Sequence, residues 1–174
     1  AQTTPFANAM EISHSDGMFI YDINGKQYLD LVAGVSACTL GHNHPKIIEA
    51  INEQVKKYLH VMVYGEYIQS PQYKLAQLLA QNLPKQLECT YFVNSGCEAI
   101  EGAMKLAKRV TSRSKIISFS NSYHGSTHGA LSIMGQEYYK SKYRPLLTDC
   151  YQLAYDCIGA LQKIDNKTAA VVVE

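Results

Sequence analysis

The sequence predicts an α/β protein, an α/β/α sandwich around a mainly parallel sheet, preceded by a β-hairpin segment. Three observations predict this class. In the second half of the chain, short β-prone runs alternate with helical stretches. The last run, AAVVV at positions 169–173, is apolar on both faces, which is typical of a strand covered on both sides. Near the start, an Asn-Gly pair separates two other β-prone runs, as in a tight hairpin.

The elements of the first half follow from local signals. In MFIYDINGKQYLDL (18–31), Asn24 and Gly25 supply the positive φ angles of the hairpin turn. GHNHP is expected to form a turn into a helix that begins at Pro45, and SPQYKLAQLLAQNLP a second helix with Ser70 as N-cap and Pro84 as its stop. The apolar face expected for the first helix consists of Ile47, Ile48, Ile51, Val55 and Leu59.

The second half predicts strands at 89–93 (CTYFV), 115–119 and 169–173, with helices at 97–110 and 155–164. We expect two parts, a hairpin-plus-helix segment over 1–60 and the first part of a larger domain over 61–174. The carboxyl ends of parallel strands are where ligands bind in open α/β sheets. Because the last strand runs directly into Glu174, we expect this chain to be the N-terminal part of a larger protein.

Composition excludes several functional classes. The 174 residues are 47% hydrophobic and 18% charged, with a net charge of +1, which gives no indication of nucleic-acid or membrane binding. Five cysteines without a Cys-x-x-Cys pair argue against a disulfide framework or a zinc knuckle and favour a reducing, cytoplasmic location. His42 and His44 have no carboxylate or thiol nearby in sequence to complete a ligand set, so we expect no metal.

The stretch YFVNSGCEAIEGAMKLAK (91–108) runs from an apolar strand directly into a helix and admits three interpretations. Free N–H groups at the helix start, with Gly96 allowing close approach, would hold an anion such as a phosphate. Ser95 and Glu98 also fit a capping box that satisfies the helix end without any ligand. Finally, Cys97 in the first turn could be a nucleophile with His124 as its base, or a small packing residue.

A second stretch, SFSNSYHGSTHGALS, follows the predicted strand at 115–119. Tyr123, His124 and Gly125 therefore lie past a strand's carboxyl end, at the same sheet edge as Ser95. An aromatic ring, an imidazole and a phosphate cradle would suit a planar, phosphorylated heteroaromatic ligand. Taken one by one, Tyr123 also fits half-buried packing and His124 a surface or hydrogen-bonded histidine.

Four segments in register resemble the class III pyridoxal-phosphate (PLP) aminotransferases: 16–51 (DGMFIYDING…), FVNSGCEAIEGAMKLAK, SYHGSTHGALS and the closing AAVVVE. This family includes ornithine, acetylornithine and 4-aminobutyrate aminotransferases and the ω-transaminases. The resemblance extends from about residue 12 to 174. It implies a fold-type I enzyme with a large domain, a smaller domain and a homodimer that forms its active sites at the interface.

The resemblance also assigns roles to individual positions. Ser95, Gly96 and Cys97 match the loop that binds the cofactor phosphate, with Cys97 where the family usually has threonine. Tyr123 matches the aromatic residue stacked on the pyridine ring, beside His124; Glu98 matches an acidic residue near the cofactor and Glu174 the glutamate that opens the next active-site loop. The cofactor-binding residues so implied are Ser95, Gly96, Cys97, Glu98, Tyr123, His124 and Glu174.

Two further positions concern the substrate. Ser126 stands where many members have an arginine that pairs with a substrate carboxylate, and Val35 where ornithine aminotransferases have a tyrosine. Both are candidate substrate-binding positions, and the serine is more similar to some ω-amine transaminases. The implied substrates are an amino donor (ornithine, acetylornithine or another ω-amino compound) and a 2-oxo acid.

The family's Schiff-base lysine lies beyond position 174, so the resemblance places no catalytic residue in this chain, and the chain alone is expected to be inactive. Two alternatives come from other functional classes. One is a non-catalytic remnant that binds a partner or a phosphorylated ligand. The other is a cysteine hydrolase that uses Cys97 and His124.

Overall fold

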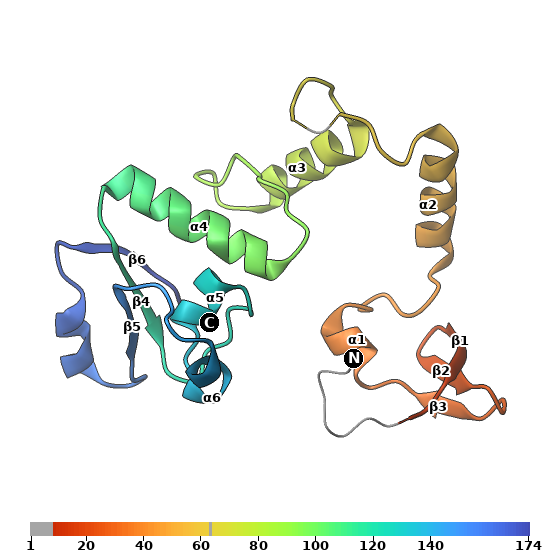
Figure 1. Ribbon diagram of the computed structural model, residues 1–174. Helices are drawn as coiled ribbons and strands as arrows, with labels where there is room; N and C mark the ends of the chain where they lie inside the picture. The colour runs from red at the N-terminus through yellow and green to blue at the C-terminus, as the bar shows by residue number, and fades with distance from the viewer. Residues whose placement is uncertain (1–8, 63) are drawn as a thin grey trace. The chain divides into compact units, whose positions relative to one another are not determined.

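The computed structural model describes residues 9–62 and 64–174 (Figure 1). The chain divides into two compact units, Ala1–Tyr73 and Lys74–Glu174. Helix α3 (Ser70–Asn82) contains the point of division and begins one residue before the predicted Pro71.

The first unit contains a three-stranded antiparallel sheet in the order β1 (Ile12–Asp16), β2 (Phe19–Asp22) and β3 (Gln27–Leu29). The hairpin predicted around Asn24-Gly25 is confirmed, but only Gly25 has the expected positive φ, at +78°, and Asn24 does not. Asp22 Oδ1 accepts hydrogen bonds of 2.9 Å from the N–H groups of Asn24 and Lys26. Strand β1 was not predicted, because ISHSD has no apolar alternation. It is defined by its pairing with β2, where the His14 and Tyr21 rings stack at 4.3 Å.

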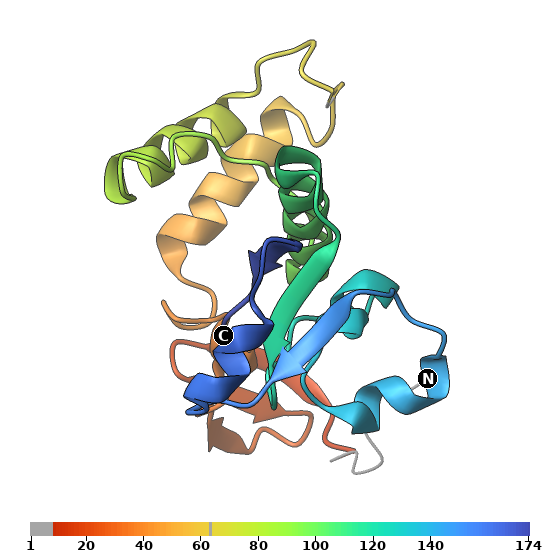
Figure 2. The same ribbon diagram turned by 90° about the vertical axis from the view of Figure 1, so that its left-hand side faces the viewer.

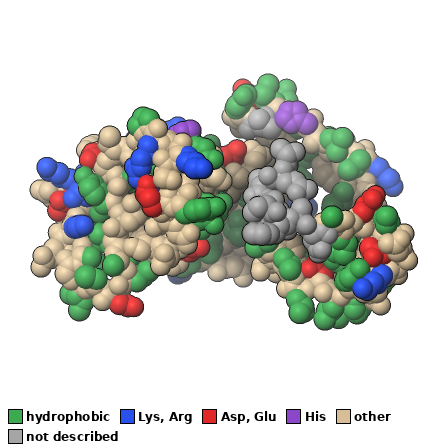
Figure 3. Space-filling model, turned by 60° about the horizontal axis from the view of Figure 1, so that its bottom comes forward, with side chains coloured by type: hydrophobic (Ala, Val, Ile, Leu, Met, Phe, Trp, Pro, Cys, Tyr) green, Lys and Arg blue, Asp and Glu red, His purple; other side chains and the backbone are tan. Residues whose placement is uncertain are grey.

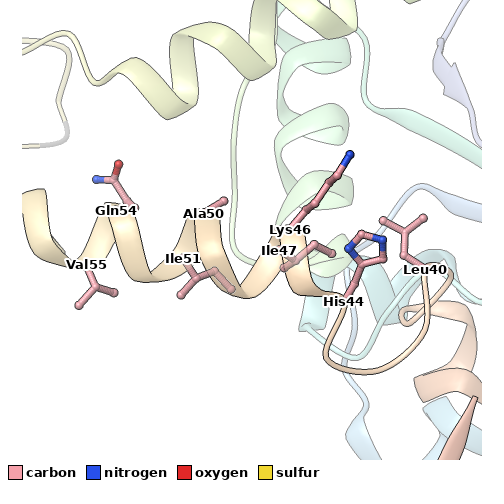
Figure 4. A pocket seen from close by; sticks show the side chains of 8 residues that line it. All are labelled: Leu40, His44, Lys46, Ile47, Ala50, Ile51, Gln54 and Val55. Atoms are coloured by element: carbon pink, nitrogen blue, oxygen red, sulfur yellow. The ribbon is translucent and has the colours of Figure 1, made fainter. Parts of the chain in front are cut away.

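After the sheet come a short helix α1 (Ala33–Ser36) and the longer helix α2 (Pro45–Lys57). As predicted, GHNHP forms a turn into a helix that begins at Pro45, and the His42 ring is hydrogen-bonded to Asp30 Oδ2 at 2.8 Å. Leu59 lies beyond the end of α2 and is therefore not part of its apolar face. That face is open within the first unit and lines a shallow apolar groove (Figure 4). The groove is lined by Leu40, His44, Lys46, Ile47, Ala50, Ile51, Gln54 and Val55.

The second unit is built on a parallel sheet in the order β5-β4-β6, which Figure 2 shows with β4 in the middle. The strands are β4 (Lys115–Phe119), β5 (Cys150–Leu153) and β6 (Thr168–Val171), and both pairings are parallel. β4 has the predicted bounds, because it is the central strand and its three middle residues are buried. The parallel sheet alternating with helices confirms the predicted class of fold.

Helices α4 (Gly96–Thr111) and α5 (His128–Ile133) pack on this sheet, α4 against β6 and α5 against β4 and β5. The core between them includes Met104 from α4, Ile116 from β4 and Ile133 from α5, all of them buried. The remaining elements are α6 (Glu137–Lys140) and the 3-10 helices η1 (Ser141–Tyr143) and η2 (Ile158–Lys163). Among the described residues, no helix is long and apolar enough to cross a membrane.

Two predicted elements differ. Residues 89–93 form no strand, and the side chains of Tyr91 and Phe92 are exposed. A strand requires a neighbouring backbone for its hydrogen bonds, and no described strand pairs with this segment. In place of the predicted helix at 155–164 the structure has the shorter 3-10 helix η2, which is not a regular α-helix.

Candidate functional site

The candidate site begins at the start of α4. Ser95 is the N-cap residue, with extended backbone angles, and its Oγ accepts a hydrogen bond of 3.2 Å from the N–H of Glu98. Glu98 Oε2 accepts hydrogen bonds from the backbone N–H of Asn94 at 2.7 Å and from its side chain at 3.1 Å. The predicted reciprocal capping by Ser95 and Glu98 is therefore present, although Glu98 reaches one residue further back than in the usual capping box.

Capping leaves donors free at this helix end. Within the described residues, the N–H groups of Gly96 and Cys97 have no acceptor. Ser95 and Gly96 are exposed, and a Cβ built on Gly96 would meet no atom within 4 Å. The 16-residue helix thus presents unpaired N–H groups and the positive end of its dipole to open space, an arrangement that favours an anion.

The loop from Ser120 to Thr127 begins where β4 ends. Its first residue is tied to the sheet, because the Ser120 N–H donates to the Leu153 carbonyl at 2.7 Å. Within the loop, Ser122 Oγ donates to the carbonyl of Phe119 at 2.7 Å. The side chain of Tyr123 remains 57% exposed, with its ring edge-on to Tyr139 at a centroid distance of 6.4 Å. Tyr123 therefore has an accessible ring on a backbone that is fixed at one end.

The loop contacts the first turn of α4. The N–H of Ser126 donates to Cys97 Sγ at 3.3 Å, and a Cβ on Gly125 would overlap the same sulfur. Gly125 has φ +121°, a conformation that L side chains rarely adopt. The predicted juxtaposition is confirmed: the helix start at Ser95–Cys97 and the loop with Tyr123 lie side by side. The Cys97 thiol faces the loop, so only its backbone N–H is free.

Glu101, one helical turn after Cys97, was missed by sequence reasoning. Its Oε1 accepts hydrogen bonds from Thr127 Oγ1 at 2.6 Å, from the N–H of Gly129 at 2.9 Å and from the N–H of Ala130 at 3.3 Å. Cys97 and Glu101 are four residues apart, which places them on one face of the helix, and this spacing was the sequence signal that could have identified Glu101. Nothing in the sequence indicated that the face would meet the loop.

His124 belongs to the same loop, and the Glu174 carboxylate lies close to it. The His124 side chain is buried, with 8% exposure, and its Nε2 has no hydrogen-bond partner among the described residues. Burial lowers the pKa of His124 below its ordinary value, and the charge of Glu174 opposes this only in part. The Glu174 carboxylate accepts a hydrogen bond from the N–H of Tyr123, so it holds the loop at the residue with the exposed ring.

The two candidate substrate positions are placed as follows. Ser126 is exposed beside the start of α4 and carries no charge. Val35 belongs to the first unit, where it lies in α1 with φ +56° and 87% exposure. Both stay predictions.

The geometry does not favour the cysteine-nucleophile interpretation. The described residues contain no hydrogen bond between Cys97 and His124, and the sulfur instead accepts the Ser126 N–H. All five cysteines are free. No group of three or more His, Cys, Asp or Glu side chains among the described residues is arranged to hold a metal ion.

Comparisons with known proteins agree with the fold. A family model described as aminotransferase class-III matches residues 2–174. The acetylornithine aminotransferase of Methanopyrus kandleri is 40% identical over 160 residues, which are 91% of this chain and 41% of that protein. The chain therefore spans about two fifths of the length of the curated relatives it matches.

Two solved structures extend the comparison. An adenosylmethionine-8-amino-7-oxononanoate aminotransferase from Methanocaldococcus jannaschii is 31% identical with a TM-score of 0.86, over 95% of this chain and 41% of that chain. The ornithine aminotransferase of Toxoplasma gondii, described with partial occupancy of PLP at its active site, is 28% identical with a TM-score of 0.79, over 98% of this chain and 42% of that chain. The three proteins have different named substrates, and the two solved structures have the fold of this chain.

Proposed function

Because the chain belongs to the class III aminotransferase family, we propose that the whole protein is a PLP-dependent aminotransferase. It moves an amino group between an amine or amino acid and a 2-oxo acid. The observation that supports this most directly is the contact between the open start of α4 and the loop with the exposed Tyr123 ring. A site for an anion beside a site for a flat ring matches the two ends of PLP.

The residues present fit the cofactor. The free N–H groups of Gly96 and Cys97 and the hydroxyl of Ser95 would bind its phosphate, with the helix dipole favouring the negative charge. The Tyr123 ring would pack against the pyridine face, while His124, held neutral by burial, adds no positive charge beneath it. Glu98 supports the phosphate loop as a cap, and Glu174 orients Tyr123 through its backbone.

When bound, PLP supplies the electron sink that lets an amino group leave one carbon skeleton and join another. In this proposal the residues of this chain bind and orient the cofactor, and no described lysine is assigned a role at it. Lys105 and Lys108 lie along α4, and Lys115 is paired with Asp165 at 2.6 Å. The lysine that moves the proton belongs to another part of the protein, so these 174 residues alone should not transaminate.

The substrate class follows from the family and from one side chain. The related proteins are named for acetylornithine, for ornithine, and for adenosylmethionine with 8-amino-7-oxononanoate, all of which carry an amino group. Ser126 offers no positive charge for a substrate carboxylate at the loop. We therefore assign an ω-amino compound or amine as donor and a 2-oxo acid as acceptor. From the family resemblance and the cysteine content we also propose a cytoplasmic homodimer.

The test uses the full-length protein that contains this chain, purified with PLP. We expect visible absorption from the bound cofactor that changes when an amine donor is added without acceptor and returns when a 2-oxo acid follows. A control with Ser95→Ala and Tyr123→Ala should show weaker cofactor retention in both variants. Folded protein with no cofactor absorption would contradict the proposal, and retention of cofactor without any response to donors would support a non-catalytic binding protein instead.

A further inference from the structure

A single carboxylate oxygen joins α4 to the start of α5. Glu101 Oε1 accepts hydrogen bonds from one hydroxyl and two backbone N–H groups, those of Thr127, Gly129 and Ala130. Thr127 is the N-cap residue of α5, and its own side chain makes no capping hydrogen bond. Glu101 therefore caps α5 from a different helix, with a charged acceptor whose hydrogen bonds are stronger than those between neutral groups.

The carboxylate of Glu101 lies directly against Gly129. A Cβ on Gly129 would overlap both carboxylate oxygens of Glu101. The glycine thus provides the space that the carboxylate occupies. The preceding residue on the same face of α4, Cys97, accepts the Ser126 N–H, so Cys97 and Glu101 together bind four residues of this segment: 126, 127, 129 and 130.

These contacts bear on the proposed cofactor site because they join α4, which carries the anion donors, to the segment in which the Tyr123 loop ends. The anion donors are at the first turn of α4, and Tyr123 is on the loop that ends at Thr127. At its other end the loop is attached to β4 rather than to α4. Of the described contacts between α4 and the loop region, those of Glu101 are the ones made by a charged group.

We propose that Glu101 is a positioning residue that holds the Tyr123 loop against the start of α4. It thereby keeps the anion donors and the aromatic ring at the separation that one rigid ligand requires. This inference rests on the proposed function. Glu101 touches neither half of the ligand. Its removal should therefore leave the binding of phosphate alone unchanged and weaken the binding of PLP, which needs both halves of the site.

The experiment measures three ligands on the full-length apoprotein: PLP, pyridoxal and inorganic phosphate. In Glu101→Ala we expect PLP to bind at least about tenfold more weakly, because the loss of a charged acceptor loosens the loop. Binding of phosphate alone, measured by its competition with PLP, should stay within about twofold of the wild type. Glu101→Gln keeps an oxygen acceptor and should restore PLP binding to within about threefold.

Gly129→Ala disrupts the same contact between Glu101 and the start of α5 without changing Glu101 itself. In the wild-type background its Cβ displaces the carboxylate, so PLP affinity should fall about as far as in Glu101→Ala. In the Glu101→Ala background the space is vacant, and the same change should cost little more. Gly159→Ala, where an added Cβ meets nothing within 4 Å, is the matched control.

Hydrogen exchange of the Gly129 and Ala130 amides should accelerate in Glu101→Ala and not in Glu101→Gln. Unchanged PLP affinity in Glu101→Ala, equal losses in both Glu101 variants, or additive effects of the Glu101 and Gly129 substitutions would each overturn the positioning role while the proposed function stands. If the wild-type protein fails to bind PLP at all, both proposals fall together.

Discussion

The backbone N–H and the sulfur of Cys97 have different roles. Its N–H lies free at the helix start, while its Sγ accepts the Ser126 N–H at 3.3 Å and packs against Gly125. The thiol therefore stabilises the loop and is turned away from the anion donors. A hydroxyl at this position can accept the same hydrogen bond, whereas a methyl group cannot.

This leads to a prediction for Cys97 in the full-length protein. Cys97→Ser should keep transaminase activity within about threefold of the wild type, because a neutral hydrogen bond contributes only about 1 kcal/mol and the serine replaces it. Cys97→Ala should lose more cofactor affinity than Cys97→Ser. Steady-state rates and PLP titration provide the measurements. Complete loss of activity in Cys97→Ser would instead point to the sulfur as a nucleophile.

His124 gives the protein a defined response to acid. Burial lowers its pKa below the ordinary value of about 6.5, so the unfolded chain binds a proton more readily than the folded one. The stability due to neutral His124 is complete above that pH and is lost as the pH falls through about 6.5 toward the lower folded pKa. His124→Gln should therefore show a smaller drop in melting temperature between pH 7.5 and pH 5.5.

The carboxylates with lowered pKa values titrate at a lower pH than His124, so they do not affect the comparison between pH 7.5 and pH 5.5. Hydrogen bonds hold the pKa values of Asp22, Asp30 and Asp165 below their usual range, so their contributions are lost only as the pH falls below about 4. An equal acid response of His124→Gln and wild type between pH 7.5 and pH 5.5 would show that His124 does not determine it.

At the scale of elements, α6 and β5 are joined through a buried amine. Lys140 is only 5% exposed, and its Nζ donates to Gln152 Oε1 at 3.0 Å. The amide of Gln152 in turn donates to Ser118 Oγ and to the Ser132 carbonyl, both at 3.3 Å. Burial lowers the pKa of Lys140, and the nearby Glu137 opposes the shift. The junction depends on each polar group having its partner.

Removing one partner should cost more than removing two. Gln152→Leu is expected to lower the free energy of unfolding by about 2 kcal/mol, because it leaves a buried charged donor without an acceptor. In a Lys140→Met background the same substitution should cost clearly less. Urea unfolding of the four full-length proteins measures this coupling. Strict additivity would mean that the hydrogen bond between Lys140 and Gln152 contributes nothing.

At the scale of the whole molecule, the net charge is only +1. On the face shown in Figure 3, basic and acidic side chains are interspersed, in agreement with the net charge of +1. On the proposed function, an anionic ligand would therefore be bound by a local arrangement, the start of α4, and not by the overall charge. Such a ligand should stabilise the folded state in proportion to its affinity for that arrangement.

We accordingly expect PLP to raise the melting temperature of the full-length apoprotein. At 100 times its dissociation constant the ligand would add about 2.7 kcal/mol to the free energy of unfolding. Pyridoxal, which lacks the phosphate, should raise the melting temperature much less at equal concentration. Equal shifts for the two compounds would exclude the helix start as the main anchor.

Much of the fold was predictable, and for local reasons. The start of α2 at Pro45, the hairpin at Gly25 and the capping by Ser95 depend on residues within a few positions of one another. Strand β4 was also located correctly, because its apolar run is short and bounded. The segment 89–93 was not, because a strand exists only where another backbone pairs with it, and its own sequence cannot supply that partner.

By itself, the sequence determined the class of fold, the capped helix end and the motifs that place the chain in its family. Only the tertiary structure decided that the Cys97 sulfur faces the Tyr123 loop, that His124 is buried without a partner, and that Glu101 caps α5. These contacts join residues 26 to 29 positions apart where they involve α4. Side chains at such separations meet only after the sheet and its helices have packed, so no local pattern encodes them.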